Sequence, residues 1–193
     1  MTRILIVILF GLTCCTSDNK QKSDVRDAGV NLTPDNDFMK FVSLLPIIKL
    51  PFETNCEKCC DHPKIDYENP LVQKFKPNGS AIVGLIKKTN DKVIILVTYP
   101  ADVLVPSVKV YDLEGKKIGE MDFMTGYCGG DFEYYGQQFF RITPDLSFNW
   151  IDTSYYLKMD TVDYQVIDTT KIEITRKQFS VNEKGQVVEN NAR

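Results

Sequence analysis

From Ser80 to its C-terminus the chain repeats one pattern, in which short apolar or alternating segments are separated by turn residues. The segment 146–151 is the clearest example, because Leu146, Phe148 and Trp150 fall on one face of an extended chain. Connections this short join neighbouring antiparallel strands. The pattern therefore predicts a mainly β domain, an antiparallel meander that forms a sandwich, a partly open barrel or propeller-like blades.

The predicted strands cover most of the second half of the chain. Two early ones, 81–86 and 93–97, are continuously apolar, which indicates burial on both faces or a central position. The other predicted segments are 108–112, 117–123, 138–142, 146–151, 162–166, 172–181 and 186–189.

One of these segments contains a change of phase. Ile172 and Ile174 fall on one face of an extended chain, whereas Phe179 and Val181 fall on the other. We expect a bulge or bend near 176–177 to bring the two pairs to the same face.

The start of the domain has the pattern of a short helix. The sequence Thr-Pro-Asp at 33–35 is typical of a helix N-terminus, and Pro46 ends the pattern. We expect one short N-terminal helix over residues 34–45, with a further helical turn at 70–75. The apolar residues at helical spacing, which we expect in the core, are Phe38, Phe41, Val42 and Leu45.

The first fifteen residues have the pattern of an export signal. Arg3 is followed by the apolar stretch Ile4–Leu12, which is too short to span a bilayer as a helix. The stretch ends in Leu12-Thr13-Cys14-Cys15, with an aliphatic residue three positions before Cys15 and small residues between them.

This segment resembles the signal peptides of bacterial lipoproteins. The resemblance implies that residues 1–14 are removed and that Cys15 carries a palmitate-containing lipid. Residues 15–32 are polar and aperiodic, as expected for a flexible tether, and 33–193 form a single β-rich domain. The implied location is the bacterial cell envelope, at the outer membrane or cell surface rather than the inner membrane.

The layout of the domain also resembles a loose group of uncharacterised lipid-anchored bacterial proteins. The shared features are a tether, a short helix, a Leu- and Pro-rich stretch and a meander with an Ile-Thr-Pro-Asp-Leu turn, here at 142–146. This resemblance implies no activity. Lysines and arginines are scattered among acidic residues and the formal net charge is −3, which argues against a nucleic-acid partner.

Four cysteines follow the signal segment: Cys56, Cys59, Cys60 and Cys128. Thiols outside the cytoplasm tend to be oxidised, so we expect structural disulfides, with at least one bridge from the loop 56–60 to Cys128. A bridge from Cys59 or Cys60 to Cys128 closes a loop of about seventy residues, worth roughly 4 kcal/mol in chain-entropy models. Adjacent Cys59 and Cys60 are poor partners for each other.

The same loop has a second interpretation. Cys56, Cys59, Cys60 and His62 bring three thiols and an imidazole close together in sequence, and they form a weak candidate site for zinc or copper. We favour disulfides over this site, and we expect no cofactor.

No catalytic motif is recognisable. His62 is the only histidine, so a Ser-His-Asp or Cys-His arrangement would have to use it. Asp122, Asp131 and Glu133 are near one another in sequence and suggest a carboxylate hydrolase as the alternative function. We consider an enzyme the less favoured class.

Aromatic residues are dense between 123 and 135. We expect Tyr127, Phe132, Tyr134 and Tyr135 to form a binding surface for a protein or glycan, because rigid aromatic side chains are effective recognition groups. The alternative is that these residues close one end of the β-structure as core. Together these patterns predict a lipid-anchored envelope protein that acts by binding.

Overall fold

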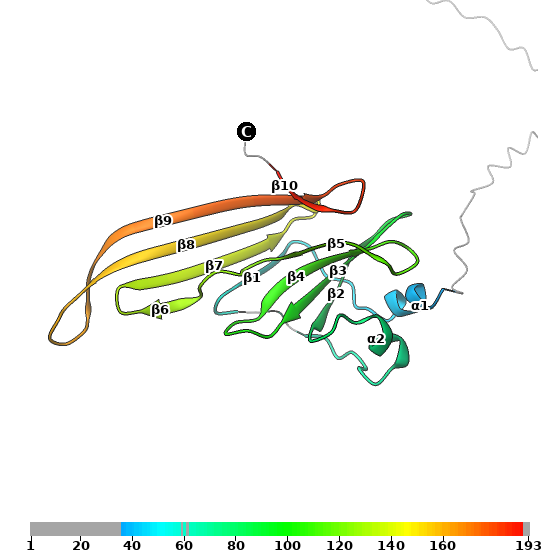
Figure 1. Cartoon of the computed structure of the whole chain (residues 1–193), viewed down its shortest axis with the longest axis horizontal. Coiled ribbons are helices and arrows are strands. Elements are labelled where there is room, and N and C mark those ends of the chain that lie inside the picture. The colour runs from blue at the N-terminus through cyan, green and yellow to red at the C-terminus, as the bar shows by residue number, and fades with distance from the viewer. Residues whose placement is uncertain (1–35, 59, 61, 191–193) are drawn as a thin grey trace, which may run out of the picture. The chain divides into compact units, whose positions relative to one another are not determined.

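Two antiparallel sheets and two short helices make up the part of the chain that this computed structural model describes, residues 36–58, 60 and 62–190. One sheet, which we call the central sheet, has the order β2-β3-β4-β5. The other, the long sheet, has the order β1-β7-β8-β9-β10, with β6 paired to β7 (Figure 1). The elements are α1 (Asp37–Ser43), β1 (Phe52–Asn55), α2 (Pro70–Phe75), β2 (Ala81–Lys88), β3 (Val93–Tyr99), β4 (Val105–Tyr111), β5 (Lys117–Asp122), β6 (Gly129–Asp131), β7 (Tyr134–Ile142), β8 (Phe148–Met159), β9 (Val166–Val181) and β10 (Val187–Glu189).

The central sheet is covered on both faces, which explains its apolar strands. On one face Ile82, Ile95 and Val97 pack against Phe38 of α1 and Val72 of α2. The other face packs against the long sheet. Six of the seven residues of β3 are buried. The expectation that the strand at 93–97 is buried on both faces is therefore confirmed.

The core between the two sheets is built around phenylalanines. Phe123 stacks on Phe140 with ring centroids 4.3 Å apart and meets the edge of Phe179 at 5.4 Å. Phe148 completes the cluster, and Val108 and Val110 contribute from the central sheet. These side chains fix the two sheets face to face, so the architecture is a sandwich rather than a set of propeller blades.

The two helices begin where polar side chains cap them. The side chain of Asn36 accepts a hydrogen bond from the Phe38 amide, and that of Asn69 accepts one from the Leu71 amide before Pro70 starts α2. The predicted start at 33–35 lies outside the described residues, and the cap is three residues later than expected.

The predicted bulge near 176–177 is wrong. The pairing of β8 with β9 runs without interruption from Phe148 opposite Phe179 to Tyr156 opposite Lys171, and register shifts occur only beyond it. Ile172 and Ile174 therefore lie on the opposite face from Phe179. The reason is that this face of the long sheet is exposed to solvent and carries apolar residues.

The mainly β fold class is confirmed, with two antiparallel sheets and few helices. The stretch 162–166 is a turn with only Val166 in a strand, so the strand predicted there is wrong. No helix in the described part of the chain is long and apolar enough to cross a membrane.

Candidate functional site

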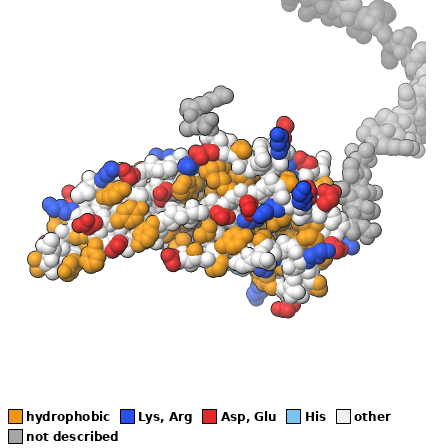
Figure 2. Space-filling model, viewed as in Figure 1, with side chains coloured by type: hydrophobic (Ala, Val, Ile, Leu, Met, Phe, Trp, Pro, Cys, Tyr) orange, Lys and Arg blue, Asp and Glu red, His pale blue; other side chains and the backbone are white. Residues whose placement is uncertain are grey.

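The long sheet extends beyond the central sheet as a projecting hairpin (Figure 1). We call this region, residues 127–137 and 152–175, the arm. Orange side chains gather along it in Figure 2. Eight of the eleven large hydrophobic side chains that are exposed among the described residues belong to the arm: Tyr127, Phe132, Val162, Tyr164, Val166, Ile167, Ile172 and Ile174. Exposed apolar areas of this kind mark interaction sites.

One face of the arm carries a row of three tyrosines. Pairing of β7 with β8 places Tyr134 opposite Tyr156, and Tyr127 packs against Tyr134 from the segment before β6. The ring centroids are 5.5 Å apart for Tyr127 and Tyr134, and 5.8 Å apart for Tyr134 and Tyr156. A β-carbon at Gly136 would lie 2.5 Å from the carbonyl oxygen of Tyr127, so glycine is needed for this approach. We call Tyr127, Tyr134 and Tyr156 the tyrosine row.

Polar contacts fix the orientation of the tyrosine row. The hydroxyls of Tyr134 and Ser154 are hydrogen-bonded at 2.9 Å, and the Tyr156 hydroxyl donates to Glu173 Oε2 at 2.9 Å. Lys171 forms an ion pair with Glu173 and lies 5.2 Å from the centre of the Tyr156 ring. The hydrogen bond and charge of Lys171 lower the pKa of Glu173, and Glu173 in turn raises the pKa of Tyr156. Charges beside the row are therefore paired, and the rings are held in place.

The opposite face of the arm is also apolar. Tyr135 and Tyr155 face each other across β7 and β8 with ring centroids 6.0 Å apart, and Ile172 is opposite Tyr155 on β9. Farther along this face a groove of about 400 Å³ is lined by eleven residues of β7, β8, β9 and the segments next to them. They are Phe139, Arg141, Thr143, Asn149, Trp150, Ile151, Arg176, Lys177, Gln178, Glu189 and Asn190.

The tip of the arm holds a wide cavity of about 610 Å³. Phe132 and Tyr164 line it and meet edge to face at 5.4 Å. Asp131, Glu133 and Asp160 lie around it, so two of the three carboxylates that the alternative hydrolase function would use share this cavity.

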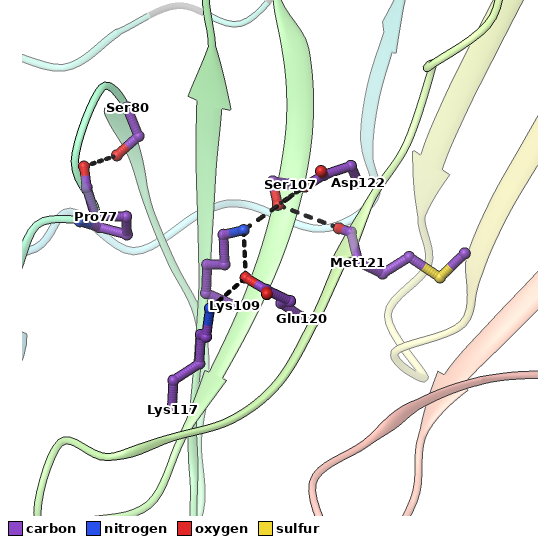
Figure 3. A network of polar contacts seen from close by, with 8 residues as sticks. All are labelled: Pro77, Ser80, Ser107, Lys109, Lys117, Glu120, Met121 and Asp122. Atoms are coloured by element: carbon purple, nitrogen blue, oxygen red, sulfur yellow. Dashed lines mark hydrogen bonds and ion pairs between the residues drawn. The ribbon is translucent and has the colours of Figure 1, made fainter.

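The third predicted carboxylate, Asp122, lies elsewhere, in the polar network of the central sheet shown in Figure 3. The Ser107 hydroxyl donates to it, and Lys109 Nζ is 3.6 Å from it and 2.8 Å from Glu120. Burial alone would lower the pKa of Lys109, but the bond to Glu120 and the nearby charges outweigh burial and raise it. Lys109 is therefore protonated at neutral pH and is no base for Ser107.

The predicted link between the cysteine loop and Cys128 is confirmed, through Cys56. The Cys56–Cys128 bridge has a Cα–Cα distance of 5.5 Å and joins the end of β1 to the segment before β6. Our preference for Cys59 or Cys60 as the partner was wrong, because pairing of β1 with β7 already brings Cys56 to this place. Cys59 lies outside the described residues, and Cys60 packs against the core between the sheets.

The bridge removes Cys56 from the candidate metal ligands. Within the described residues no group of three or more His, Cys, Asp or Glu side chains is placed to hold a metal ion. His62 is exposed, and its Nε2 lies 2.8 Å from the Thr98 hydroxyl.

The four residues predicted as a binding surface all belong to the arm. Tyr127 and Phe132 are 49% and 61% exposed, and Tyr134 and Tyr135 are half-buried on opposite faces. Phe123, at the start of the same aromatic stretch, is core. From the sequence we did not include Tyr156, Tyr164, Ile172 and Ile174 in this surface. A signal for the two isoleucines was present, because they fall on the opposite face of the extended chain from Phe179 and Val181.

Comparison of the chain with family models, with curated proteins and with solved structures found no match. The class of the protein is therefore defined by its fold and site: it is a two-sheet antiparallel β protein with an aromatic arm.

Proposed function

We propose that this chain is a lipid-anchored protein of the bacterial cell envelope that acts by binding a protein partner through the tyrosine row of its arm. The observation that carries the proposal is the tyrosine row itself, three contacting rings on an arm that holds most of the exposed large hydrophobic side chains of the described residues, Tyr127 among them. Large aromatic side chains with a polar tip are the commonest strong contacts in protein interfaces.

The geometry of the row favours a protein over a glycan. A sugar stacks on a flat aromatic face, but neighbouring rings here are inclined by 53° and 75°. Inclined rings present both edges and faces, which suits the uneven surface of a protein. The Tyr134 and Tyr156 hydroxyls, bonded to Ser154 and Glu173, add polar positions to an otherwise apolar surface.

The proposal is tested in the native envelope with a photo-crosslinking residue at position 127 of the full chain. We expect a discrete crosslinked protein whose yield falls at least tenfold when Tyr134 and Tyr156 are changed to alanine. The matched control is Tyr155→Ala, on the other face of the same strand, which should leave the yield unchanged. An equal loss with the control variant, or no crosslinked protein at all, would contradict the proposal.

A carboxylate hydrolase is the second candidate, and the shared cavity of Asp131, Glu133 and Asp160 favours it. It predicts turnover of an envelope polysaccharide that is lost in Asp131→Asn or Glu133→Gln. Tyr156→Ala should then leave that turnover intact, which separates the two functions.

A further inference from the structure

The arm has one open strand edge. β9 pairs with β8 on one side, but on its other side β10 begins only at the level of Phe179. Within the described part of the chain, no strand pairs with that side between Val166 and Gln178, and Figure 1 shows β9 as the margin of the sheet. At about 3.3 Å per residue this is roughly 40 Å of strand edge.

The backbone groups on this edge can be assigned by parity. The Asn190 amide donates to the Gln178 carbonyl at 2.7 Å, so Gln178 points away from β8. Alternate residues of an antiparallel strand point the same way, and the register is uninterrupted from Lys171 to Phe179. Ile172, Ile174 and Arg176 therefore present their N–H and C=O groups to the open side.

The charges on β9 determine which strand such an edge can accept. Charged side chains normally protect an edge strand from unrelated strands. Consider an antiparallel pair made of β9 from two copies of the chain, with Ile172 opposite Ile172. In this pair, Lys171 of each copy lies opposite Glu173 of the other. Asp168 then lies level with residues 175–177 of the copy, which include Arg176 and Lys177.

Two nearby midpoints are unfavourable. Centring the pair on Glu173 places two carboxylates face to face, and centring it on Ile174 places Lys171 opposite Lys177 twice. With Ile172 at the midpoint the central pair is a hydrogen-bonded one, because Ile172 belongs to the residues whose N–H and C=O groups point outward.

We propose that two copies of this chain pair antiparallel through the open edges of β9, with Ile172 on the twofold axis. The two long sheets then become one continuous sheet. The pairing uses the backbone edge of β9, whereas the tyrosine row lies on a face of the sheet. Lys171 and Glu173 also contact Tyr156, so partner binding is tested in the chain with β9 unchanged. A finding that the unchanged chain is monomeric would leave the proposed partner binding standing, and absence of a partner would leave the proposed pairing standing.

Charge reversal tests the pairing in the full-length chain in detergent. We expect the unchanged chain to have twice the monomer mass by light scattering, and Lys171→Glu or Glu173→Lys alone to have the monomer mass. The double variant, and an equimolar mixture of the two single variants, should regain the doubled mass, because opposite charges then face each other again. Circular dichroism confirms that each variant is folded, and Lys158→Glu in β8 is the control that should stay dimeric.

A disulfide placed on the axis tests the register. In an antiparallel hydrogen-bonded pair the two Cα atoms are about 5.5 Å apart, which a disulfide spans. Ile172→Cys should therefore give a covalent dimer on mild oxidation, above the background of the unchanged chain. Ile174→Cys, similarly exposed but roughly 13 Å from its copy along the strand, should not.

A monomeric unchanged chain, charge variants that all keep the doubled mass, or equal crosslinking at positions 172 and 174 would each overturn the proposal. Crosslinking of position 172 to another part of the same chain, or to a different protein, would assign the edge to that strand instead.

Discussion

Lys109 shows what the alternation of a strand leaves open about a single residue. It alternates with Val108 and Val110 on β4, a pattern typical of a strand with one solvent-facing side. The side chain is only 5% exposed, because the sheet is covered on both faces. Its positive charge is compensated by the carboxylates of Glu120 and Asp122. Alternation reports which side chains share a face, but it does not report what covers that face.

Replacement of Lys109 by methionine should weaken the acid sensitivity of the fold. The hydrogen bonds from Lys109 and Lys117 hold the pKa of Glu120 below its ordinary value of 4.5. A lowered folded-state pKa contributes stability that is present above the ordinary value and is lost as pH falls through the lowered one. We expect Lys109→Met to have a shallower loss of unfolding free energy between pH 5 and pH 3, measured by urea denaturation.

At pH 7 the same variant should differ from the unchanged chain by no more than about 2 kcal/mol, because a buried ion pair roughly offsets its own desolvation. Glu120 keeps Lys117 as a partner in the variant. Identical acid profiles for the two proteins would mean that Lys109 does not set the pKa of Glu120.

At the scale of elements, most strands could be predicted, but the arm could not. We expected one strand to end at Ile151, a short strand at 162–166, where the structure has a turn, and the next strand from Ile172. Two-residue alternation arises when one face of a strand is buried, and the intervening residues of the arm have solvent on both faces. The aromatic residues themselves were visible in the sequence, but the pairing that brings Tyr156 beside Tyr134 was not.

The disulfide illustrates the same limit. Bridges from Cys56, Cys59 or Cys60 to Cys128 close loops of nearly equal length, so chain entropy cannot choose among them. The choice depends on β1, which ends at Asn55 and pairs with β7. That pairing is a long-range contact, and no local pattern in the sequence encodes it.

The Cys56→Ser, Cys128→Ser double variant should lose about 2–4 kcal/mol of unfolding free energy, because the bridge closes a separation of 72 residues. Denaturant titration with and without a reductant measures this loss. The reductant should bring the unchanged chain close to the variant and affect the variant much less. Equal stability of the two oxidised proteins would contradict a stabilising role for the bridge.

At the scale of the whole molecule, the proposed anchor is the first question. We expect metabolic labelling with a fatty acid to mark the protein, and Cys15→Ala to abolish the label. Cys14→Ala is the matched control and should keep it. Label that persists in Cys15→Ala would assign the lipid to Cys14, and an unlabelled unchanged chain would contradict the anchor altogether.

The unequal covering of the two sheets has a consequence for how the molecule fluctuates. Amides of β3, enclosed by helices on one side and by the long sheet on the other, exchange with solvent only when the whole fold opens. Amides between 153 and 175, in the arm, exchange through local fraying that leaves the rest of the molecule folded. A bound partner would therefore slow exchange in the arm alone. Hydrogen–deuterium exchange would locate the partner's contact surface before the partner is identified.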